Sequence, residues 1–239
     1  MTKFVLKGKV SSIQTLGAVD GPGVRFTVFM QGCNLRCGCC HNPETWQNEG
    51  GKEYTVDQLA QRCERYKEYF GKSGGITLSG GEPLLQADFA REVFYLCKQK
   101  GINTCLDTSG SILNDSVKKL LEQTDRVLLD IKYTTDEDYK KYVGCSINAP
   151  LEFLDYLSKK NIPTVIRQVI VPSLNDNEQN IEALKKIAQK HSNIEKIELL
   201  PFKKLCSIKY DNLGIDFKFK DMAEPTKEII EYLENIKNK

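Results

Sequence analysis

The chain has 239 residues, of which 40% are hydrophobic and 28% charged, and its formal net charge at pH 7 is +2. This length suits one domain with a sizeable core, so we expect a single domain over residues 1–239. The near balance of charge gives no strong footprint for nucleic acid as a partner. Residues 1–12 lack the apolar stretch of a signal peptide, and no run approaches about 18 apolar residues. We therefore expect a cytoplasmic protein without a membrane span.

Nine cysteines are many for a protein in a reducing compartment, and their odd number prevents a closed disulfide framework from using them all. Metal or redox chemistry is therefore the better interpretation. Four cysteines fall between positions 33 and 40. The remaining five are expected to be small buried hydrophobic residues: Cys63, Cys97, Cys105, Cys145 and Cys206.

Apolar, β-branched runs bounded by Gly, Pro, Asn or Asp recur along the chain and predict strands. In chain order these are Arg25–Met30, Gly75–Leu78, Asn103–Asp107, Arg126–Ile131, Thr164–Val171 and Glu195–Leu200. Amphipathic segments between them predict helices. The first begins after Thr55, with Gln58 completing a capping box and apolar positions continuing to Phe70. The others cover Gln86–Lys100, Asp115–Glu122, Asp136–Tyr142, Leu151–Lys160, Asn177–Lys190 and Thr226–Asn238.

This alternation predicts an α/β fold with a parallel sheet and right-handed crossovers. Six strand–helix units are two short of a closed eightfold barrel, so we expect a partial, open (β/α)6 barrel of TIM-like type. In such folds the catalytic residues lie at the carboxyl ends of the strands.

A cysteine-rich loop, residues 31–43, follows the first predicted strand. Within it Cys33, Cys37 and Cys40 have the spacing C-x3-C-x2-C, and Gly and Pro residues favour a wrapping loop. A [4Fe–4S] centre normally takes four Cys thiolates. Three would leave one iron without a protein ligand, and such an open position can bind a substrate chelate.

Two other interpretations of this loop stay open on spacing alone. A zinc site could use Cys37, Cys40, His41 and one further ligand, although the sequence offers no second ligand pair at similar spacing. A thioredoxin-like redox pair could be formed by Cys37 and Cys40.

Further motifs mark the strand ends. They are Asp20-Gly21-Pro22-Gly23-Val24-Arg25 before the first strand, Ser79-Gly80-Gly81-Glu82-Pro83-Leu84, Asp107-Thr108-Ser109-Gly110, Asp130-Ile131-Lys132, Arg167 with Val171-Pro172, and Leu199-Leu200-Pro201-Phe202. The cysteine loop resembles the hallmark of the radical S-adenosylmethionine (SAM) superfamily. The whole series, from about Lys9 to Gly214, closely resembles the activases of glycyl-radical enzymes, in particular the type that acts on pyruvate formate-lyase.

This resemblance implies a [4Fe–4S] cluster on Cys33, Cys37 and Cys40, with SAM chelated to the fourth iron. One electron would split SAM, and the resulting radical would remove a hydrogen atom from a glycine Cα of a partner enzyme. That partner would be pyruvate formate-lyase or a close relative, and flavodoxin or ferredoxin would supply the electron. Oxygen should destroy the activity, as expected of an enzyme of anaerobic metabolism.

The resemblance also assigns residues to roles. For SAM they are Cys39, Cys40, His41, Gly80, Gly81, Glu82, Asp130, Ile131, Lys132 and Lys203, with Glu82 either contacting SAM or tethering its loop. Asp107 and Thr108 would bind a monovalent cation, unless they form only a strand-end turn. The loop Asp20, Gly21, Pro22 and Gly23 would meet the partner's glycine segment, unless it is a plain turn, and Arg167 would contact substrate or SAM.

Two positions depart from the family pattern. Cys39 stands where an aromatic residue is usual, and Lys203 where relatives often place a histidine. The interval between the cysteine loop and the Gly-Gly-Glu strand contains a single cysteine, Cys63, so it cannot hold the extra clusters of a ferredoxin-like insert. The absence of such an insert favours the pyruvate formate-lyase type.

The rival functions are a radical SAM enzyme with another substrate and a non-catalytic iron–sulfur or zinc-binding module.

Overall fold

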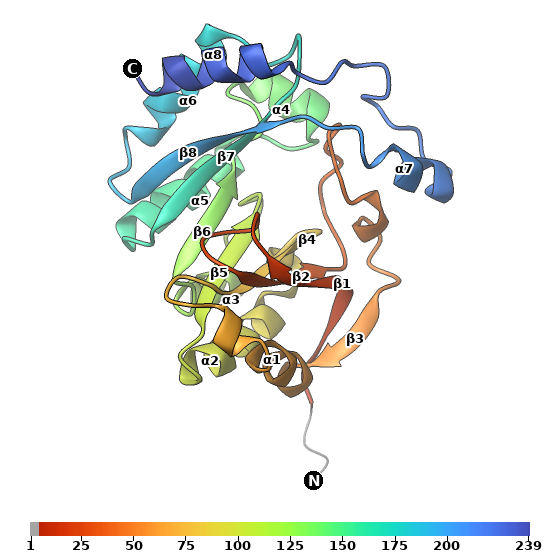
Figure 1. Cartoon of the computed structure of the whole chain (residues 1–239), viewed down its shortest axis with the longest axis vertical. Helices are drawn as coiled ribbons and strands as arrows, with labels where there is room; N and C mark the ends of the chain where they lie inside the picture. The colour runs from red at the N-terminus through yellow and green to blue at the C-terminus, as the bar shows by residue number, and fades with distance from the viewer. Residues whose placement is uncertain (1–4) are drawn as a thin grey trace. The chain divides into compact units, whose positions relative to one another are not determined.

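The computed structural model describes residues 5–239 (Figure 1). Its strands are β1 (Lys7–Gly17), β2 (Arg25–Met30), β3 (Lys52–Thr55), β4 (Gly75–Gly80), β5 (Asn103–Thr108), β6 (Arg126–Asp130), β7 (Thr164–Ile170) and β8 (Ile194–Pro201). Its helices are α1 (Val56–Glu64), α2 (Ala87–Gln99), α3 (Asp115–Leu121), α4 (Asp136–Tyr142), α5 (Asn148–Lys159), α6 (Glu178–Ala188), α7 (Ser207–Leu213) and α8 (Lys227–Lys237). Every strand and helix predicted from the sequence is present.

The strand order is β3-β1-β2-β4-β5-β6-β7-β8. The order is linear, with β3 and β8 at its ends, so the sheet does not close on itself. This confirms the α/β class and the partial, open barrel. The chain divides into two compact units, the first made of the described residues up to Asn34 and of Thr45–Leu128, the second of Leu35–Glu44 and Leu129–Lys239. A single domain over residues 1–239 stays a prediction, and residues 1–4 lie outside the described part.

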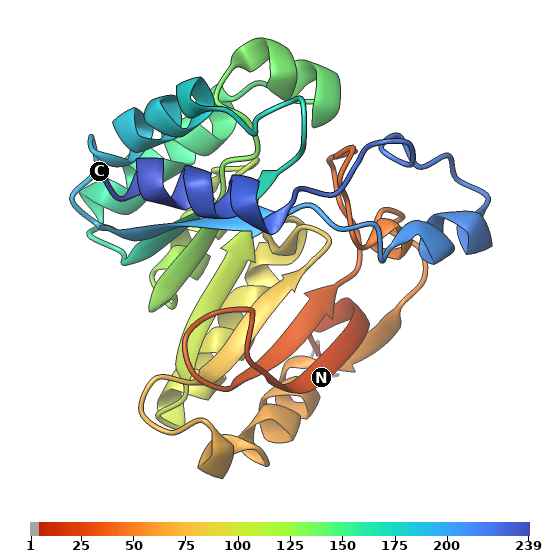
Figure 2. The same cartoon turned by 45° about the horizontal axis from the view of Figure 1, so that its top comes forward.

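In the first unit, β2, β4 and β5 pair in parallel, with Met30 opposite Gly80 at their carboxyl ends. Their apolar residues are almost fully buried, as expected for parallel strands covered on both faces. Antiparallel β1 and β3 extend this sheet beyond β2, and Figure 2 shows the loop that connects β1 to β2. The sequence analysis missed both strands, because β1 mixes polar and small residues and β3 has only four residues.

Helix α1 begins at the expected N-cap. The Thr55 side chain accepts a hydrogen bond from the Gln58 backbone N–H at 3.2 Å, and the Gln58 side chain accepts one from the Thr55 backbone N–H at 2.9 Å. The helix ends at Glu64, before the predicted Phe70, and a short 3-10 turn over Lys67–Tyr69 follows. The apolar periodicity therefore continued past the end of the α-helix.

The capping box at Thr55 is expected to stabilise the folded protein. Replacing Thr55→Ala removes one half of the capping box and leaves a first-turn N–H without its acceptor, so we expect a loss of about 1 kcal/mol. Urea unfolding of the variant and the wild type measures this difference. An unchanged midpoint at equal slope would show that the box contributes nothing to stability.

In the second unit, β7 and β8 pair in parallel, with Ile170 opposite Pro201. Helices α6 and α8 contact each other, and α8 contacts β8 (Figure 1). After β8, the ring of Phe202 lies 6.3 Å from that of Phe217 and 6.1 Å from that of Phe219, and Tyr210 stacks on Phe217 at 4.5 Å. This aromatic cluster holds α7, a short helix that the sequence analysis did not predict.

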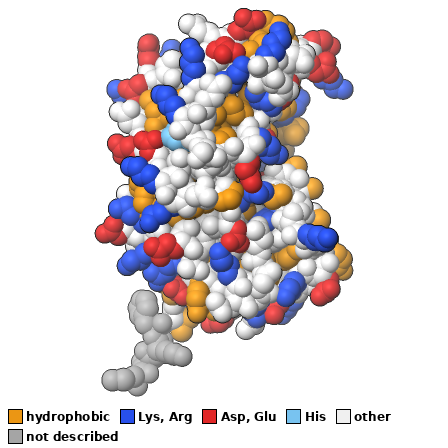
Figure 3. All heavy atoms as spheres, turned by 90° about the vertical axis from the view of Figure 1, so that its left-hand side faces the viewer, with side chains coloured by type: hydrophobic (Ala, Val, Ile, Leu, Met, Phe, Trp, Pro, Cys, Tyr) orange, Lys and Arg blue, Asp and Glu red, His pale blue; other side chains and the backbone are white. Residues whose placement is uncertain are grey.

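The sequence analysis also made predictions about the scattered cysteines, membrane spans and the balance of charge. Of the five scattered cysteines, Cys145 is partly exposed and the other four are buried, as predicted. Within residues 5–239 no helix is both long and apolar enough to cross a bilayer. On the face in Figure 3, Lys and Arg side chains alternate with Asp and Glu, without a large patch of one sign.

Candidate functional site

The Gly-Gly-Glu motif lies where β4 ends beside β2 in the first unit. Gly80 has φ +104, a left-handed value that favours glycine. The N–H of Gly81 donates to the Met30 carbonyl at 3.0 Å, and the N–H of Glu82 donates to the Gly32 carbonyl at 2.8 Å. A Cβ at Gly81 would lie 2.1 Å from the Gly32 oxygen, so only glycine permits this approach. The loop therefore presents bare main chain directly beside the start of the cysteine loop.

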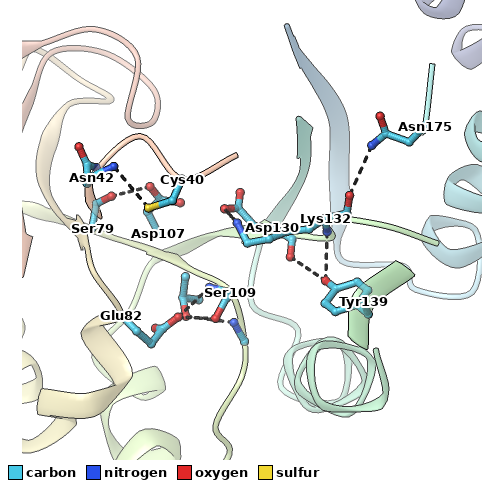
Figure 4. A network of polar contacts seen from close by, with 12 residues as sticks. Cys40, Asn42, Ser79, Glu82, Asp107, Ser109, Asp130, Lys132, Tyr139 and Asn175 are labelled. Carbon is cyan, nitrogen blue, oxygen red and sulfur yellow. Dashed lines mark hydrogen bonds and ion pairs between the residues drawn. The ribbon is translucent and has the colours of Figure 1, made fainter. Parts of the chain in front are cut away.

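Glu82 is 1% exposed, and its carboxylate receives a full set of donors from the end of β5 and from its own loop. It accepts hydrogen bonds from the Thr108 hydroxyl at 2.6 Å, the Ser109 N–H at 3.0 Å, the Ser109 hydroxyl and the Leu84 N–H at 3.2 Å (Figure 4). The carboxylate thus ties two strand ends together. Of the two roles considered from the sequence, this geometry favours the tether.

Burial raises the pKa of Glu82, and the hydrogen bonds donated by Ser109 and Thr108 oppose that rise. The ordinary pKa of this carboxyl group is 4.5. Because its pKa is higher in the folded protein than in the unfolded chain, the folded state has its full stability below pH 4.5, where the group is protonated in both states. That stability is lost as pH rises through the folded-state pKa. Relative to Glu82→Gln, which does not titrate, the wild type should therefore become less stable as pH rises above 4.5. Urea unfolding of both proteins between pH 5 and pH 8 measures the difference. If the difference in unfolding free energy stays constant with pH, or shifts in favour of the wild type, the pKa of Glu82 is not raised in the folded protein.

The residues expected to bind a cation lie next to this tether. Asp107 accepts a hydrogen bond from the Ser79 hydroxyl at 2.6 Å, which links β5 to β4 (Figure 4). The Thr108 hydroxyl donates to Glu82 and accepts from the Gly110 N–H at 3.1 Å. Asp107 and Thr108 are therefore both held by neighbours from the same strand ends, and their role toward a cation stays a prediction.

The Asp20 loop is fixed to the middle of β2 and β4, at the third residue of each strand. The Asp20 carboxylate accepts from the Thr27 hydroxyl at 3.1 Å, and its carbonyl accepts from the Thr77 hydroxyl at 2.7 Å. Gly21 and Gly23, on either side of Pro22, both have positive φ, and a Cβ at Gly23 would lie 2.6 Å from the Gly74 nitrogen. These glycines are thus needed for the loop's own conformation, and contact with a partner enzyme stays a prediction.

The cysteine loop is divided between the units, with Cys33 in the first and Cys37, Cys39 and Cys40 in the second. All four are partly exposed. In the second unit the N–H of Gly38 donates to the Tyr142 carbonyl at 2.8 Å, and that of Cys40 donates to the Cys37 carbonyl at 3.2 Å. Among residues 5–239, no three His, Cys, Asp or Glu side chains are already gathered around a metal position.

The surroundings of these thiols fit an anionic, thiolate-bound cluster. The Asn42 N–H donates to Cys40 Sγ at 3.4 Å (Figure 4), a bond that favours the thiolate. Burial lowers the pKa of Lys132, but the Asp130 carboxylate and the Cys37 and Cys39 thiols outweigh it and hold that pKa well above its ordinary value. Lys132 is therefore held as a cation, and the Cys37 and Cys39 sulfurs lie within range of its charge.

Asp130 and Lys132 form a tight ion pair at the end of β6. Lys132 Nζ lies 2.7 Å from the Asp130 carboxylate. Burial alone would raise the pKa of Asp130, but Lys132 and then Arg167 hold it below its ordinary value. The structure thus gathers three of the predicted site residues, Asp130, Lys132 and Arg167, in one electrostatic group. Ile131, which lies between Asp130 and Lys132 and was also predicted to contact SAM, is fully buried. Its N–H donates to the Arg167 carbonyl at 2.9 Å.

Two residues that the sequence analysis did not single out fix this pair. The Lys132 N–H donates to the Tyr139 hydroxyl at 3.0 Å, and the Asn175 amide donates to the Lys132 carbonyl at 3.4 Å (Figure 4). Tyr139 lies on α4 and Asn175 follows β7, so only the folded chain brings them to Lys132.

His41 and Lys203 lie together in the second unit. His41 Nε2 lies 2.9 Å from the Lys203 carbonyl oxygen, to which the protonated ring nitrogen donates. The Lys203 ammonium pairs with Glu224 at 2.9 Å. Two further residues that the sequence analysis missed fasten this loop. Lys209 Nζ donates to the His41 carbonyl at 3.0 Å and pairs with Glu44 at 2.6 Å, and the Tyr210 hydroxyl donates to the Cys40 carbonyl at 3.0 Å.

Comparisons with known proteins agree with the strand-end motifs. Residues 27–185 match the sequence model of the Radical SAM superfamily. The pyruvate formate-lyase-activating enzyme of Clostridium pasteurianum is 44% identical over 225 residues, which is 94% of this chain and 94% of that protein. The pyruvate formate-lyase 1-activating enzyme of Escherichia coli (strain K12) is 42% identical over 232 residues, which is 96% of this chain and 94% of that protein.

Two solved structures share the fold. A domain of a pyruvate-formate lyase-activating enzyme from Bacteroides vulgatus has a TM-score of 0.58 at 22% identity and covers 69% of this chain and 93% of its own. Streptococcus suis SuiB bound to S-adenosylmethionine has a TM-score of 0.66 at 13% identity, over 85% of this chain and 44% of its own. The chain belongs to the radical SAM superfamily and, within it, to the family of pyruvate formate-lyase-activating enzymes.

Proposed function

We propose that this chain activates pyruvate formate-lyase by removing a hydrogen atom from a glycine Cα of that enzyme, which leaves a glycyl radical. The observation that carries the proposal is identity of 42–44% with pyruvate formate-lyase-activating enzymes over nearly the whole of both chains. The intact series of strand-end motifs supports it.

Membership of the superfamily implies a [4Fe–4S] cluster and SAM as cofactors. Cys33, Cys37 and Cys40 are the residues that would hold the cluster, because three thiolates leave one iron open for the amino and carboxylate groups of SAM. When bound, the reduced cluster supplies the electron that splits SAM into methionine and a 5′-deoxyadenosyl radical. The protein contributes binding, orientation and charge.

The residues around SAM have distinct tasks in this proposal. Gly80 and Gly81 offer main-chain carbonyls to the cationic amino group, since nothing projects from either residue. Glu82 acts through the tether to Thr108 and Ser109 that keeps this loop in place. Asp130 binds the ribose or the methionine end, with Lys132 beside it to offset its charge.

The remaining assignments rely on the main chain. Cys39, Cys40 and His41 contact SAM through their backbone, which survives the replacement of an aromatic residue by Cys39. Ile131 can contribute only its backbone because its side chain is buried. The Lys203 ammonium already pairs with Glu224, so its contact with SAM requires that ion pair to open.

Two further parts complete the proposal. Asp107 and Thr108 supply the oxygen ligands that a monovalent cation prefers. The loop Asp20, Gly21, Pro22 and Gly23, together with Arg167, meets the glycine segment of the partner. A flavodoxin or a ferredoxin delivers the electron.

The test is made with anaerobically reconstituted enzyme, SAM and a reductant, mixed with pyruvate formate-lyase and, separately, with other glycyl-radical enzymes. We expect the EPR signal of a glycyl radical to appear on pyruvate formate-lyase. A signal on a different glycyl-radical enzyme alone would reassign the partner. Formation of 5′-deoxyadenosine without a signal on any of them would contradict the activase function.

A further inference from the structure

Tyr133 directly follows the Asp130-Ile131-Lys132 motif and is a buried phenol that the proposed function does not use. Its side chain is 3% exposed, and within residues 5–239 its hydroxyl group has no hydrogen-bond partner. A buried donor without a partner destabilises a fold, so native proteins keep few of them unless a ligand completes the bond. The Tyr133 hydroxyl is therefore a candidate contact for whatever binds beside it.

The ring of Tyr133 is fixed against helix α4. Its centroid lies 5.3 Å from that of Tyr142 in a tilted arrangement and 6.4 Å from that of Tyr139 in an edge-on arrangement. Both neighbours belong to α4, the helix that follows Tyr133 in the chain. The hydroxyl group thus has a set position that does not depend on a hydrogen bond of its own.

The end of α4 also holds the cysteine loop, which belongs to the same unit from Leu35 onward. The Arg36 N–H donates to the Val143 carbonyl at 3.1 Å, and the Gly38 N–H donates to the Tyr142 carbonyl at 2.8 Å. Cys37 lies between these two main-chain bonds. The helix end that packs on the Tyr133 ring therefore also fixes a proposed cluster ligand.

The electrostatic surroundings of the phenol agree with this placement. Burial raises the pKa of Tyr133, and the thiols of Cys39 and then Cys37 have the next largest effects, both in the same direction. The two sulfurs therefore lie within electrostatic range of the hydroxyl. A phenol is protonated at neutral pH, so Tyr133 presents a hydrogen-bond donor to this side of the loop.

We propose that the Tyr133 hydroxyl donates a hydrogen bond to a sulfur of the cluster on the Cys37 side and thereby raises the reduction potential of the cluster. Hydrogen bonds to the sulfurs are one of the means by which a protein sets that potential. A donor favours the reduced cluster because that state carries more negative charge. This inference rests on the proposed function, because it assumes that Cys37 binds a cluster.

The test uses Tyr133→Phe, which removes the hydroxyl and keeps the ring. Tyr142→Phe is the matched control, because it makes the same change in the neighbouring ring, whose hydroxyl pairs with the exposed Lys141. Both variants and the wild type are reconstituted anaerobically and titrated with dithionite in the absence of SAM. EPR of the reduced cluster gives the midpoint potential, and iron and sulfide content gives the cluster occupancy. Urea unfolding of the three apoproteins is measured separately.

We expect the ratio of reduced to oxidised cluster at a fixed potential to fall about tenfold in Tyr133→Phe, which is a midpoint about 59 mV more negative for a one-electron couple. Tyr142→Phe should titrate as the wild type does. The apoprotein of Tyr133→Phe should be at least as stable as that of the wild type, because the hydroxyl has no partner to lose.

An unchanged potential in Tyr133→Phe at full cluster occupancy would overturn the inference, and so would an equal shift in Tyr142→Phe. Weaker binding of SAM at an unchanged potential would assign the hydroxyl to SAM instead. A less stable Tyr133→Phe apoprotein would show that the hydroxyl serves the fold and not the cluster. A wild-type protein that binds no four-iron cluster would reject the proposed function itself, and this inference with it.

Discussion

Replacing Cys33→Ala, Cys37→Ala or Cys40→Ala is expected to abolish the [4Fe–4S] cluster and with it all cleavage of SAM, whereas Cys39→Ala should retain both. The reason is ligand number. In the proposed cluster three thiolates would hold three irons, and loss of one would leave a second iron without a protein ligand, so the cluster should no longer be retained. Iron and acid-labile sulfide content after anaerobic reconstitution, together with the absorbance near 400 nm, gives the result for each variant.

Cys39 is the matched control because it lies in the same loop and is also partly exposed. Desolvation raises the pKa of its thiol to about 11, against an opposing effect of Lys132. The assignment of ligands itself rests on the C-x3-C-x2-C spacing and not on that titration. A protein that keeps its cluster as Cys40→Ala and loses it as Cys39→Ala would show that the ligand set is wrong.

The second large effect concerns Arg25, a fully buried guanidinium at the amino ends of β2, β4 and β5. It donates to the Thr77 hydroxyl at 2.9 Å, to the Asn103 side-chain oxygen at 2.9 Å and to the carbonyls of Ser73 at 3.1 Å and Ile76 at 2.5 Å. Asn103 in turn donates to Asp125 at 3.3 Å. One side chain thus satisfies acceptors from two neighbouring strands and a loop.

We expect Arg25→Met to cost about 3–5 kcal/mol, because methionine fills much of the space but leaves these buried acceptors without donors. Arg62→Met is the control, since Arg62 is exposed and makes one bond to the Tyr54 hydroxyl; its cost should stay within about 0.5 kcal/mol. Urea unfolding under anaerobic conditions measures both. Equal costs for the two variants would show that the buried network contributes little.

The parallel strands could be predicted from the sequence to within two residues at each end, because buried strands read as apolar runs bounded by turn residues. The edge strands could not. In β1, Lys, Ser and Gln interrupt the apolar residues, and β3 is held by its pairing with Lys7–Val10 and not by its own composition. Helix α7 was missed because the aromatic cluster beneath it, and not its own seven residues, fixes it.

The candidate site also has parts that the sequence indicates and parts that only the folded chain brings together. The cysteine spacing and the glycines of the strand ends are local patterns, so the sequence alone indicates them. The supporting contacts depend on tertiary proximity. Ser109 meets Glu82 across 27 positions, and Tyr210 meets Cys40 across 170. No local pattern marks such partners.

The central claim is that one iron of a cysteine-bound cluster is open to SAM. EPR of the anaerobically reconstituted, reduced protein, recorded before and after addition of SAM, tests it most directly. We predict a [4Fe–4S]⁺ spectrum whose g values shift when SAM binds, followed by one 5′-deoxyadenosine for each electron delivered. A protein that binds only zinc, or a four-iron spectrum that SAM leaves unchanged, would contradict the claim.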